Sequence, residues 1–274
     1  MKQEYSLAYL TVYGASPPDM IHLAAEAGYD YVSLRPIAMG MAGEPVFDLA
    51  ADRRLFARTK EALTSTGLGL HDIELARIVE EVEVASYEPA LRASAELGCK
   101  HVLSSIWSGD RGTYIRKFGE LCDLADRHGM TVDLEFVPIA AVRDIAQTVE
   151  VLRSVDRPNA GMMVDAHHFH RAREKLEHLA GLPREWFRFF HLCDAPAEIP
   201  ADVDELRRIM REGRSYVGEG GVDVAAIVDA LPPLVYSIEL PNLAGVRELG
   251  LAGHARRCLE TAKLYFEKHP RRGP

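Results

Sequence analysis

Residues 130–168, MTVDLEFVPIAAVRDIAQTVEVLRSVDRPNAGMMVDAHH, contain two short apolar segments that each end in a carboxylate. The first segment, 131–136, carries Glu135, and the second, which starts at 161, reaches Asp165 before the chain turns polar. Between them, 141–155 has the length and pattern of a helix and stops just before a proline. The order strand, helix, strand predicts two parallel neighbouring strands, so both carboxylates are expected at the same rim of a sheet.

The same alternation of strand-like and helix-like segments runs along the whole chain, with glycines such as Gly28 and Gly67 ending the helical patterns. Eight strands are predicted, at 7–13, 29–36, 69–75, 100–106, 131–136, 161–165, 186–194 and 235–240. A long loop is predicted at 37–51, and a helix at 171–180 follows the second carboxylate.

Eight such units in a chain of this length predict one α/β domain over 1–274, a (β/α)₈ TIM barrel, because the typical barrel has about 250 residues. A doubly wound open sheet is the alternative. It is disfavoured because no G-x-G-x-x-G motif follows the first strand.

Composition narrows the class of partner. A net charge of -9 and a pI near 5.7 argue against nucleic acid, because binding phosphates needs clustered Lys and Arg. No apolar run approaches the roughly 18 residues of a membrane span, and no signal-peptide pattern opens the chain. The four cysteines are widely spaced and form no C-x-x-C pair, which favours reduced thiols. A cytoplasmic protein without a nucleic-acid or membrane partner is therefore expected.

Four polar residues occupy equivalent places at the ends of predicted strands in the second half of the chain: Glu135, Asp165, His191 and Glu239. Any one of them has a simpler explanation as a helix cap or a salt-bridge partner. All four at matching positions predict convergence near the barrel axis, where three unpaired carboxylates would repel one another in a low-dielectric site. A divalent cation resolves that repulsion, and three oxygens with one imidazole suit Mn²⁺, Mg²⁺ or Co²⁺.

At these residues the chain resembles the xylose isomerase-like TIM barrels, a superfamily that includes ketose 3-epimerases, inosose dehydratases, 3-dehydroshikimate dehydratases and endonuclease IV. The matching pieces are Val132-Asp133-Leu134-Glu135, Val164-Asp165-Ala166-His167-His168, Phe190-His191-Leu192-Cys193-Asp194, Arg214, Gly218-Glu219-Gly220 and Ser237-Ile238-Glu239.

The resemblance implies one divalent metal ion, with Mn²⁺ preferred and Mg²⁺, Co²⁺ or Zn²⁺ as alternatives, held by Glu135, Asp165, His191 and Glu239. It also implies that His168 and Arg214 contact the substrate. Glu135 and Glu239 are then expected to act as catalytic acid and base on opposite faces of a hydroxyketone, one removing a proton and the other returning it.

Two further residues are candidates for substrate binding. His71, at the predicted end of the third strand, is either a pocket residue or an ordinary hydrogen-bonded histidine. Arg35, at the end of the second strand, either holds a substrate carboxylate or phosphate or forms a salt bridge with Glu74 or Asp72. Trp107 and Tyr13 are expected to form an apolar wall of the pocket or to pack in the core.

The leading expectation is a metal-dependent isomerase or epimerase that passes through an enediolate of a sugar, keto-cyclitol or keto acid. A dehydratase of the inosose or 3-dehydroshikimate type is the runner-up, because the same enediolate can lose a β-hydroxyl. Phe136 to Ala141 lack the N-R-x-E-type stretch of ketose 3-epimerases, which argues against a free hexulose. A barrel that binds sugar without turning it over is the alternative of another class. The sequence is compatible with a homo-oligomer but carries no clear signal for one.

Overall fold

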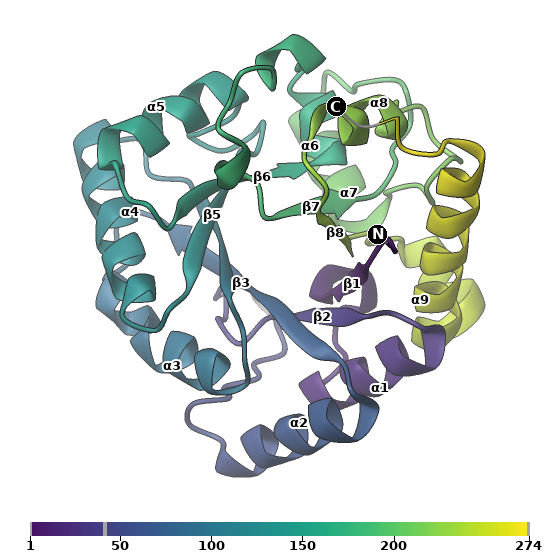
Figure 1. Ribbon diagram of the computed structural model, residues 1–274, viewed down its shortest axis with the longest axis horizontal. Coiled ribbons are helices and arrows are strands. Elements are labelled where there is room, and N and C mark those ends of the chain that lie inside the picture. Colours follow the sequence, from purple (N-terminus) through teal and green to yellow (C-terminus); the bar gives the residue numbers. More distant parts are fainter. Residues whose placement is uncertain (1, 41–42, 273–274) are drawn as a thin grey trace.

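A computed structural model describes residues 2–40 and 43–272 of the chain. Eight parallel strands pair in chain order, and β8 pairs with β1 to close the barrel (Figure 1). This confirms the predicted (β/α)₈ barrel. The strands are β1 (Tyr5–Ala8), β2 (Tyr31–Leu34), β3 (Gly69–Ile78), β4 (His101–Ile106), β5 (Thr131–Glu135), β6 (Ala160–Asp165), β7 (Phe189–Leu192) and β8 (Val235–Ile238).

Helices surround the strands on the outside of the barrel (Figure 1). The helices are α1 (Pro17–Ala27), α2 (Arg53–Thr66), α3 (Glu88–Glu96), α4 (Arg111–Asp126), α5 (Ile145–Val155), α6 (Ala166–Arg171), α7 (Val203–Glu212), α8 (Val224–Ala230) and α9 (Leu243–Lys268). Short 3₁₀ segments are η1 (Tyr9–Val12), η2 (Val84–Tyr87), η3 (Leu176–His178) and η4 (Arg184–Trp186). Helices α2, α4, α5, α6, α7 and α8 each begin at an aspartate whose carboxylate accepts a backbone N–H, a cap typically worth about 1 kcal/mol.

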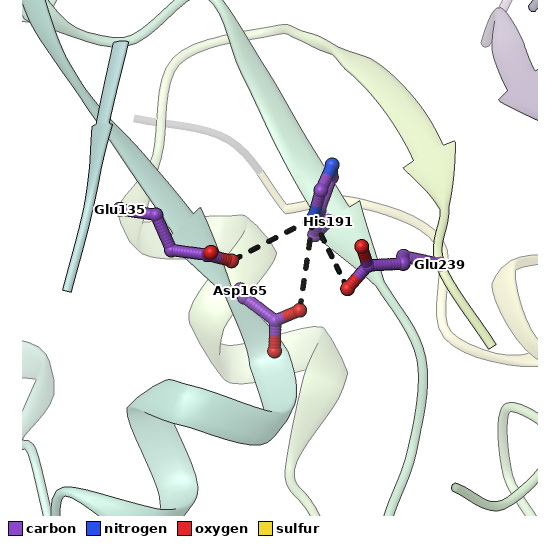
Figure 2. Close-up of side chains that lie close together, drawn as sticks. All are labelled: Glu135, Asp165, His191 and Glu239. Carbon is purple, nitrogen blue, oxygen red and sulfur yellow. Dashed lines mark ion pairs between the residues drawn. The ribbon is translucent and has the colours of Figure 1, made fainter. Parts of the chain in front are cut away.

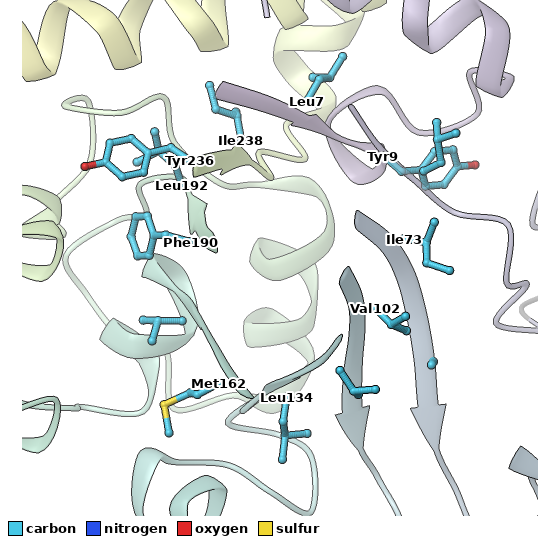
Figure 3. Packing of buried hydrophobic residues seen from close by; sticks show 14 of the residues in the cluster. Leu7, Tyr9, Ile73, Val102, Leu134, Met162, Phe190, Leu192, Tyr236 and Ile238 are labelled. Carbon is cyan, nitrogen blue, oxygen red and sulfur yellow. The ribbon is translucent and has the colours of Figure 1, made fainter. Parts of the chain in front are cut away.

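Alternation along the strands separates two environments. Val132 and Leu134 of β5 face outward and join the large core between barrel and helices. Figure 3 shows Leu134 together with other members of this core, such as Ile73 and Phe190. Their neighbours point to the barrel axis, so Asp133 and Glu135 of the same strand face the interior.

Inside the barrel, Leu103, Met163 and Phe189 form a small apolar cluster against Leu75. Met163 precedes Asp165 by two residues and Phe189 precedes His191 by two, so this apolar layer lies one step below the acidic rim.

Several predicted element boundaries were wrong, and the seventh strand, predicted at 186–194, is the shorter β7 (Phe189–Leu192). The first strand ends at Ala8, because the N–H of Tyr9 donates to Glu74 Oε1 (3.0 Å) and the chain turns into η1. The third strand continues to Ile78, three residues beyond the predicted end. In place of a helix at 171–180, α6 starts directly after Asp165, whose carboxylate caps it. Part of the predicted loop at 37–51, residues 41 and 42, lies outside the described residues.

Across the described parts of the chain, no helix combines the length and the apolar character needed to cross a bilayer.

Candidate functional site

The four predicted ligand residues stand at the carboxyl ends of four successive strands. Glu135 and Asp165 are the last residues of β5 and β6, His191 lies within β7, and Glu239 directly follows β8. Parallel pairing sets Asp165 beside His191, and His191 beside Ser237. Because the side-chain period of a strand is two, these positions alternate with the outward-facing core residues, and all four side chains point to the barrel axis.

Their ligand atoms converge. One donor atom from each residue lies within 4.8 Å of the other three. The Nδ1 atom of His191 lies 3.5 Å from Glu239 Oε2, 3.7 Å from Asp165 Oδ2 and 3.8 Å from Glu135 Oε1 (Figure 2). All four residues are buried: Asp165 and His191 are fully inaccessible, and Glu135 and Glu239 are 6% and 4% exposed.

The centre leaves polar atoms unsatisfied. Within the described residues, Glu135 Oε1 and His191 Nδ1 are buried and make no hydrogen bond. Such orphaned atoms are costly unless another group satisfies them. Metal–ligand bonds of about 2.0–2.4 Å place ligand atoms roughly 3–4.7 Å apart, which matches this cluster. Three carboxylates and one imidazole are also a suitable donor set for Mn²⁺, Mg²⁺, Co²⁺ or Zn²⁺. The residues therefore fit a single divalent cation.

Arg214 lies against two of the four residues. It follows α7 and is held by its own N–H, which donates to Pro241 O (3.1 Å), and by Asn242, whose Nδ2 donates to Arg214 O (2.8 Å). Its Nη1 is 2.6 Å from Asp165 Oδ2, and its Nη2 is 2.8 Å from Glu239 Oε2. The guanidinium is 1% exposed and also borders the cavity described below. It therefore supplies a fixed positive charge to the centre.

This charge distribution separates the carboxyl groups by acidity. Burial and the neighbouring Glu239 and Asp165 raise the pKa of Glu135 well above its usual value. Burial also acts to raise the pKa of Asp165 and Glu239, but Arg214 and His191 outweigh it. They hold the pKa of Asp165 well below its usual range and lower that of Glu239 to about 2. Of these three carboxyl groups, Glu135 therefore holds a proton most readily.

His168 borders the same centre from α6. Its backbone N–H donates to Asp165 Oδ1 (2.9 Å), and this hydrogen bond fixes the turn between β6 and α6. Its Nε2 is 3.8 Å from Glu135 Oε1, and its Nδ1 is buried without a hydrogen bond. Burial lowers the pKa of His168 to about 4, so the ring is neutral near pH 7.

Arg35 borders the cavity and also forms the predicted salt bridge with Glu74. Its Nη2 lies 2.8 Å from Glu74 Oε2, and its guanidinium stacks 5.1 Å from the centroid of the Tyr9 ring. Its Nε is buried and unsatisfied among the described residues. Glu74 also borders the cavity, although the sequence predicts it only as a salt-bridge partner of Arg35.

The predicted position of His71 was wrong. Because β3 runs from Gly69 to Ile78, His71 lies at its beginning, and its ring contacts the rings of His101 and Phe189, which open β4 and β7. Its Nδ1 is 3.1 Å from Asp72 Oδ1. The cavity lining contains Glu74 and Leu75 from this strand, and not His71.

Asp194, the last residue of the predicted H-x-x-D spacing, organises the loop beyond β7. Its carboxylate accepts four backbone N–H groups, from Ala195, Gly218, Gly220 and Val222, at 2.7–3.0 Å. The match at 218–220 therefore marks a loop folded around a buried carboxylate and not a ligand to the centre.

Above the four residues opens a cavity of about 450 Å³, a size typical of sites for small organic ligands. Glu135, His168, Arg214 and Glu239 border it, and so do Trp107 and Tyr13, as predicted. Sequence reasoning missed Thr11, Ser105 and Asn242, which also border the cavity, because none of them belongs to a motif.

The fold and site together define an α/β barrel with a buried carboxylate–histidine centre at the mouth formed by the strand ends. The xylose isomerase-like TIM barrel family model matches residues 21–261, and the chain belongs to this family.

The curated proteins that match the chain share one name, inosose isomerase. An inosose isomerase of Bacillus velezensis is 25% identical over 237 residues, covering 80% of this chain and 81% of that protein. An inosose isomerase of Bacillus subtilis is 29% identical over 120 residues, but that match spans only 41% of its length and 43% of this chain.

Solved structures share the fold at low sequence identity. A crystal structure described as the IolI protein with a binding zinc atom has a TM-score of 0.79 at 19% identity, covering 97% of this chain and 99% of that one. The probable 3-DHS dehydratase AsbF of Bacillus anthracis has a TM-score of 0.71 at 18% identity, covering 98% and 100%.

Proposed function

We propose that this chain is a divalent-metal-dependent isomerase or epimerase of a sugar or sugar-like keto substrate, such as a keto-cyclitol or keto acid. One observation carries the proposal: three carboxylates and an imidazole converge, buried, beneath a cavity of about 450 Å³. The relatives named inosose isomerase support the class of reaction and of substrate. The four cysteines are buried and unpaired, which supports the predicted cytoplasmic location because a reducing compartment maintains free thiols.

The metal ligands in this proposal are Glu135, Asp165, His191 and Glu239, with Mn²⁺ the preferred ion. A divalent cation held by these residues would supply Lewis acidity to a substrate carbonyl, an effect worth several kcal/mol. The chain's own residues then supply the proton transfer.

Glu135 and Glu239 lie on opposite sides of His191 (Figure 2). One carboxylate removes the proton from the carbon next to the carbonyl, and the other returns a proton to the opposite face or to the adjacent atom. Each such transfer typically contributes about 10²–10⁴-fold. The neutral ring of His168 can donate or accept a hydrogen bond to a substrate hydroxyl, and Arg214 keeps Glu239 ionised. Arg35, which borders the cavity, is assigned to a substrate oxygen.

A dehydratase is the second candidate, because Val137 presents an apolar side chain to the cavity just beyond Glu135. Polar contacts to a free ketose are thus missing at that place. After the same proton abstraction, the C–O bond to a hydroxyl β to the carbonyl breaks, and the hydroxyl leaves as water with a proton from the second carboxyl group.

The test is proton exchange in D₂O with protein stripped by a chelator and reloaded with Mn²⁺. The substrates are ketoses, inososes and 3-dehydroshikimate, and NMR and mass spectrometry follow the products. We expect metal-dependent deuterium incorporation next to the carbonyl, at unchanged mass apart from the label. Loss of water identifies the dehydratase. Glu135→Gln should abolish exchange while it retains most of the bound metal. Glu150→Gln, at an exposed ion pair with Arg111, is the control and should have no effect.

Exchange that is independent of metal, or that survives in Glu135→Gln, contradicts the proposal. Saturable sugar binding without exchange of any substrate would make the chain a binding protein.

A further inference from the structure

The cavity lining has a charged part and a large apolar part. Glu135, Arg214 and Glu239 border it at the carboxylate–histidine centre, and Arg211 and Glu212 add charge at the end of α7.

Apolar side chains from well-separated elements form much of the remaining wall. Leu10 comes from η1, Leu75 from β3 and Met210 from α7. Trp107 and Val137 follow β4 and β5, so the apolar wall continues around the mouth. An apolar platform for one face of a sugar ring would need only one side of the cavity.

Three neutral polar side chains in this wall, Thr11, Ser105 and Asn242, are already engaged within the chain. Thr11 Oγ1 donates to Ile238 O (2.7 Å) and accepts from the N–H of Leu240 (2.9 Å). Ser105 Oγ accepts from Trp107 Nε1 (2.9 Å). Asn242 donates through Nδ2 to Arg214 O and accepts through Oδ1 from the N–H of Gly245, both at 2.8 Å.

A free sugar directs hydroxyls outward around its whole edge. A hydroxyl placed against the apolar part of such a wall loses its hydrogen bonds to water without a replacement, which is unfavourable. A hydrocarbon group in the same place loses no hydrogen bond and gains affinity by leaving water.

We propose that the substrate of this cavity joins a hydroxyketone head to an apolar aryl or alkyl substituent, in place of a free polyhydroxylated sugar. The inference rests on the proposed function, because the head is assigned to the carboxylate–histidine centre. The substituent lies against the wall that contains Leu75, Trp107, Val137 and Leu243.

Two ketones with the same CO–CH₂OH head separate the two halves of the cavity. In 2-hydroxyacetophenone the carbonyl bears a phenyl ring, and in dihydroxyacetone it bears a second hydroxymethyl group. Calorimetry on the Mn²⁺-loaded protein should give at least tenfold tighter binding of the aryl ketone, equivalent to about 1.4 kcal/mol. D-fructose, a free ketose, should bind more weakly than the aryl ketone.

Substitutions in the apolar wall test which residues cause the preference for the aryl ketone. Val137→Thr keeps the shape of the side chain but adds a hydroxyl to the wall, and Leu243→Ser shortens a side chain that is already 39% exposed, so folding should survive. Each should reduce the aryl preference at least threefold and leave dihydroxyacetone binding unchanged. Leu249→Ser changes a similarly exposed leucine of α9 that does not border the cavity, and it should change neither affinity.

Equal or weaker binding of the aryl ketone overturns the inference, as does a failure to detect its binding. Tighter binding of D-fructose, or a preference that both wall variants leave intact, also overturns it. Proton exchange at the CH₂OH carbon of both ketones, relative to the rate in buffer, is measured in parallel. Exchange without an aryl preference refutes the inference alone, whereas an aryl preference without exchange refutes the proposed function alone.

Discussion

Replacing Arg214 by Met should destabilise the metal-free protein and at the same time tighten its binding of Mn²⁺. The guanidinium is 1% exposed and lies 2.6 and 2.8 Å from carboxylate oxygens of Asp165 and Glu239. Breaking a buried ion pair from one side leaves an uncompensated charge and typically costs about 3–5 kcal/mol. Unfolding entropy near 2.1 cal/mol/K per residue gives about 0.6 kcal/mol/K for 274 residues, so the melting temperature should fall by about 5–9 °C.

The same geometry predicts that Arg214→Met strengthens metal binding although it destabilises the metal-free protein. Arg214 and a divalent cation compete for the field of the same carboxylates, so removal of the guanidinium should strengthen Mn²⁺ binding by at least about tenfold, or 1.4 kcal/mol. The loss of stability should therefore be smaller in the loaded protein than in the stripped protein, by the same amount.

Chemical unfolding and calorimetric titration, each with stripped and loaded protein, measure all four sides of this cycle. Arg207→Met is the control on α7, because Arg207 pairs with Asp204 at the exposed surface and its loss should cost less than about 1 kcal/mol. Weaker Mn²⁺ binding by Arg214→Met, or an equal stability loss with and without metal, would show that Arg214 and the metal do not share these carboxylates.

Three further predictions concern the barrel that holds the site. Asp194→Ala removes the acceptor of four backbone N–H groups and should lower the free energy of unfolding by about 3 kcal/mol, measured by urea unfolding, and a loss below 1 kcal/mol would contradict the role given to it. Burial lowers the pKa of His101 to about 4, so as pH falls from 6.5 towards 4 the unfolded chain binds a proton at this residue before the folded protein does. The free energy of unfolding should therefore decrease over this pH range, and His101→Gln should reduce that decrease by up to about 3 kcal/mol. An unchanged slope of stability against pH in the variant would be inconsistent with this prediction. Gly161→Ala places a Cβ 1.9 Å from Arg188 Nη1 and 2.5 Å from Trp186 O and should cost about 1–3 kcal/mol, whereas Gly109→Ala meets nothing within 4 Å and should be nearly neutral; similar melting temperatures for the two variants would argue against this packing.

The sequence predicted the fold and the four central residues because both depend on local pattern. A strand with a period of two assigns Glu135 to the same face as Asp133, and parallel pairing then aligns the strand ends. The barrel follows from eight repeats of one unit, so errors of a few residues at element ends did not change it.

Other features depend on contacts between distant parts of the chain, and local pattern does not carry them. The first strand stops early because Glu74, 65 residues away, accepts the N–H of Tyr9. His71 was misplaced because the apolar and polar order of 69–78 does not reveal where β3 ends. The contact of Arg214 with Asp165 joins residues 49 apart. The early end of the first strand and the position of Arg214 share one cause, a polar contact between residues far apart in the sequence.

The central claim is that Glu135, Asp165, His191 and Glu239 hold one divalent cation in common. Anomalous X-ray diffraction from crystals of the chelator-stripped protein soaked in Mn²⁺ tests it directly. We expect a single manganese peak within about 2.0–2.4 Å of one oxygen from each carboxylate and of one nitrogen of His191. A peak elsewhere, or no peak at a Mn²⁺ concentration that saturates binding in solution, would contradict the account.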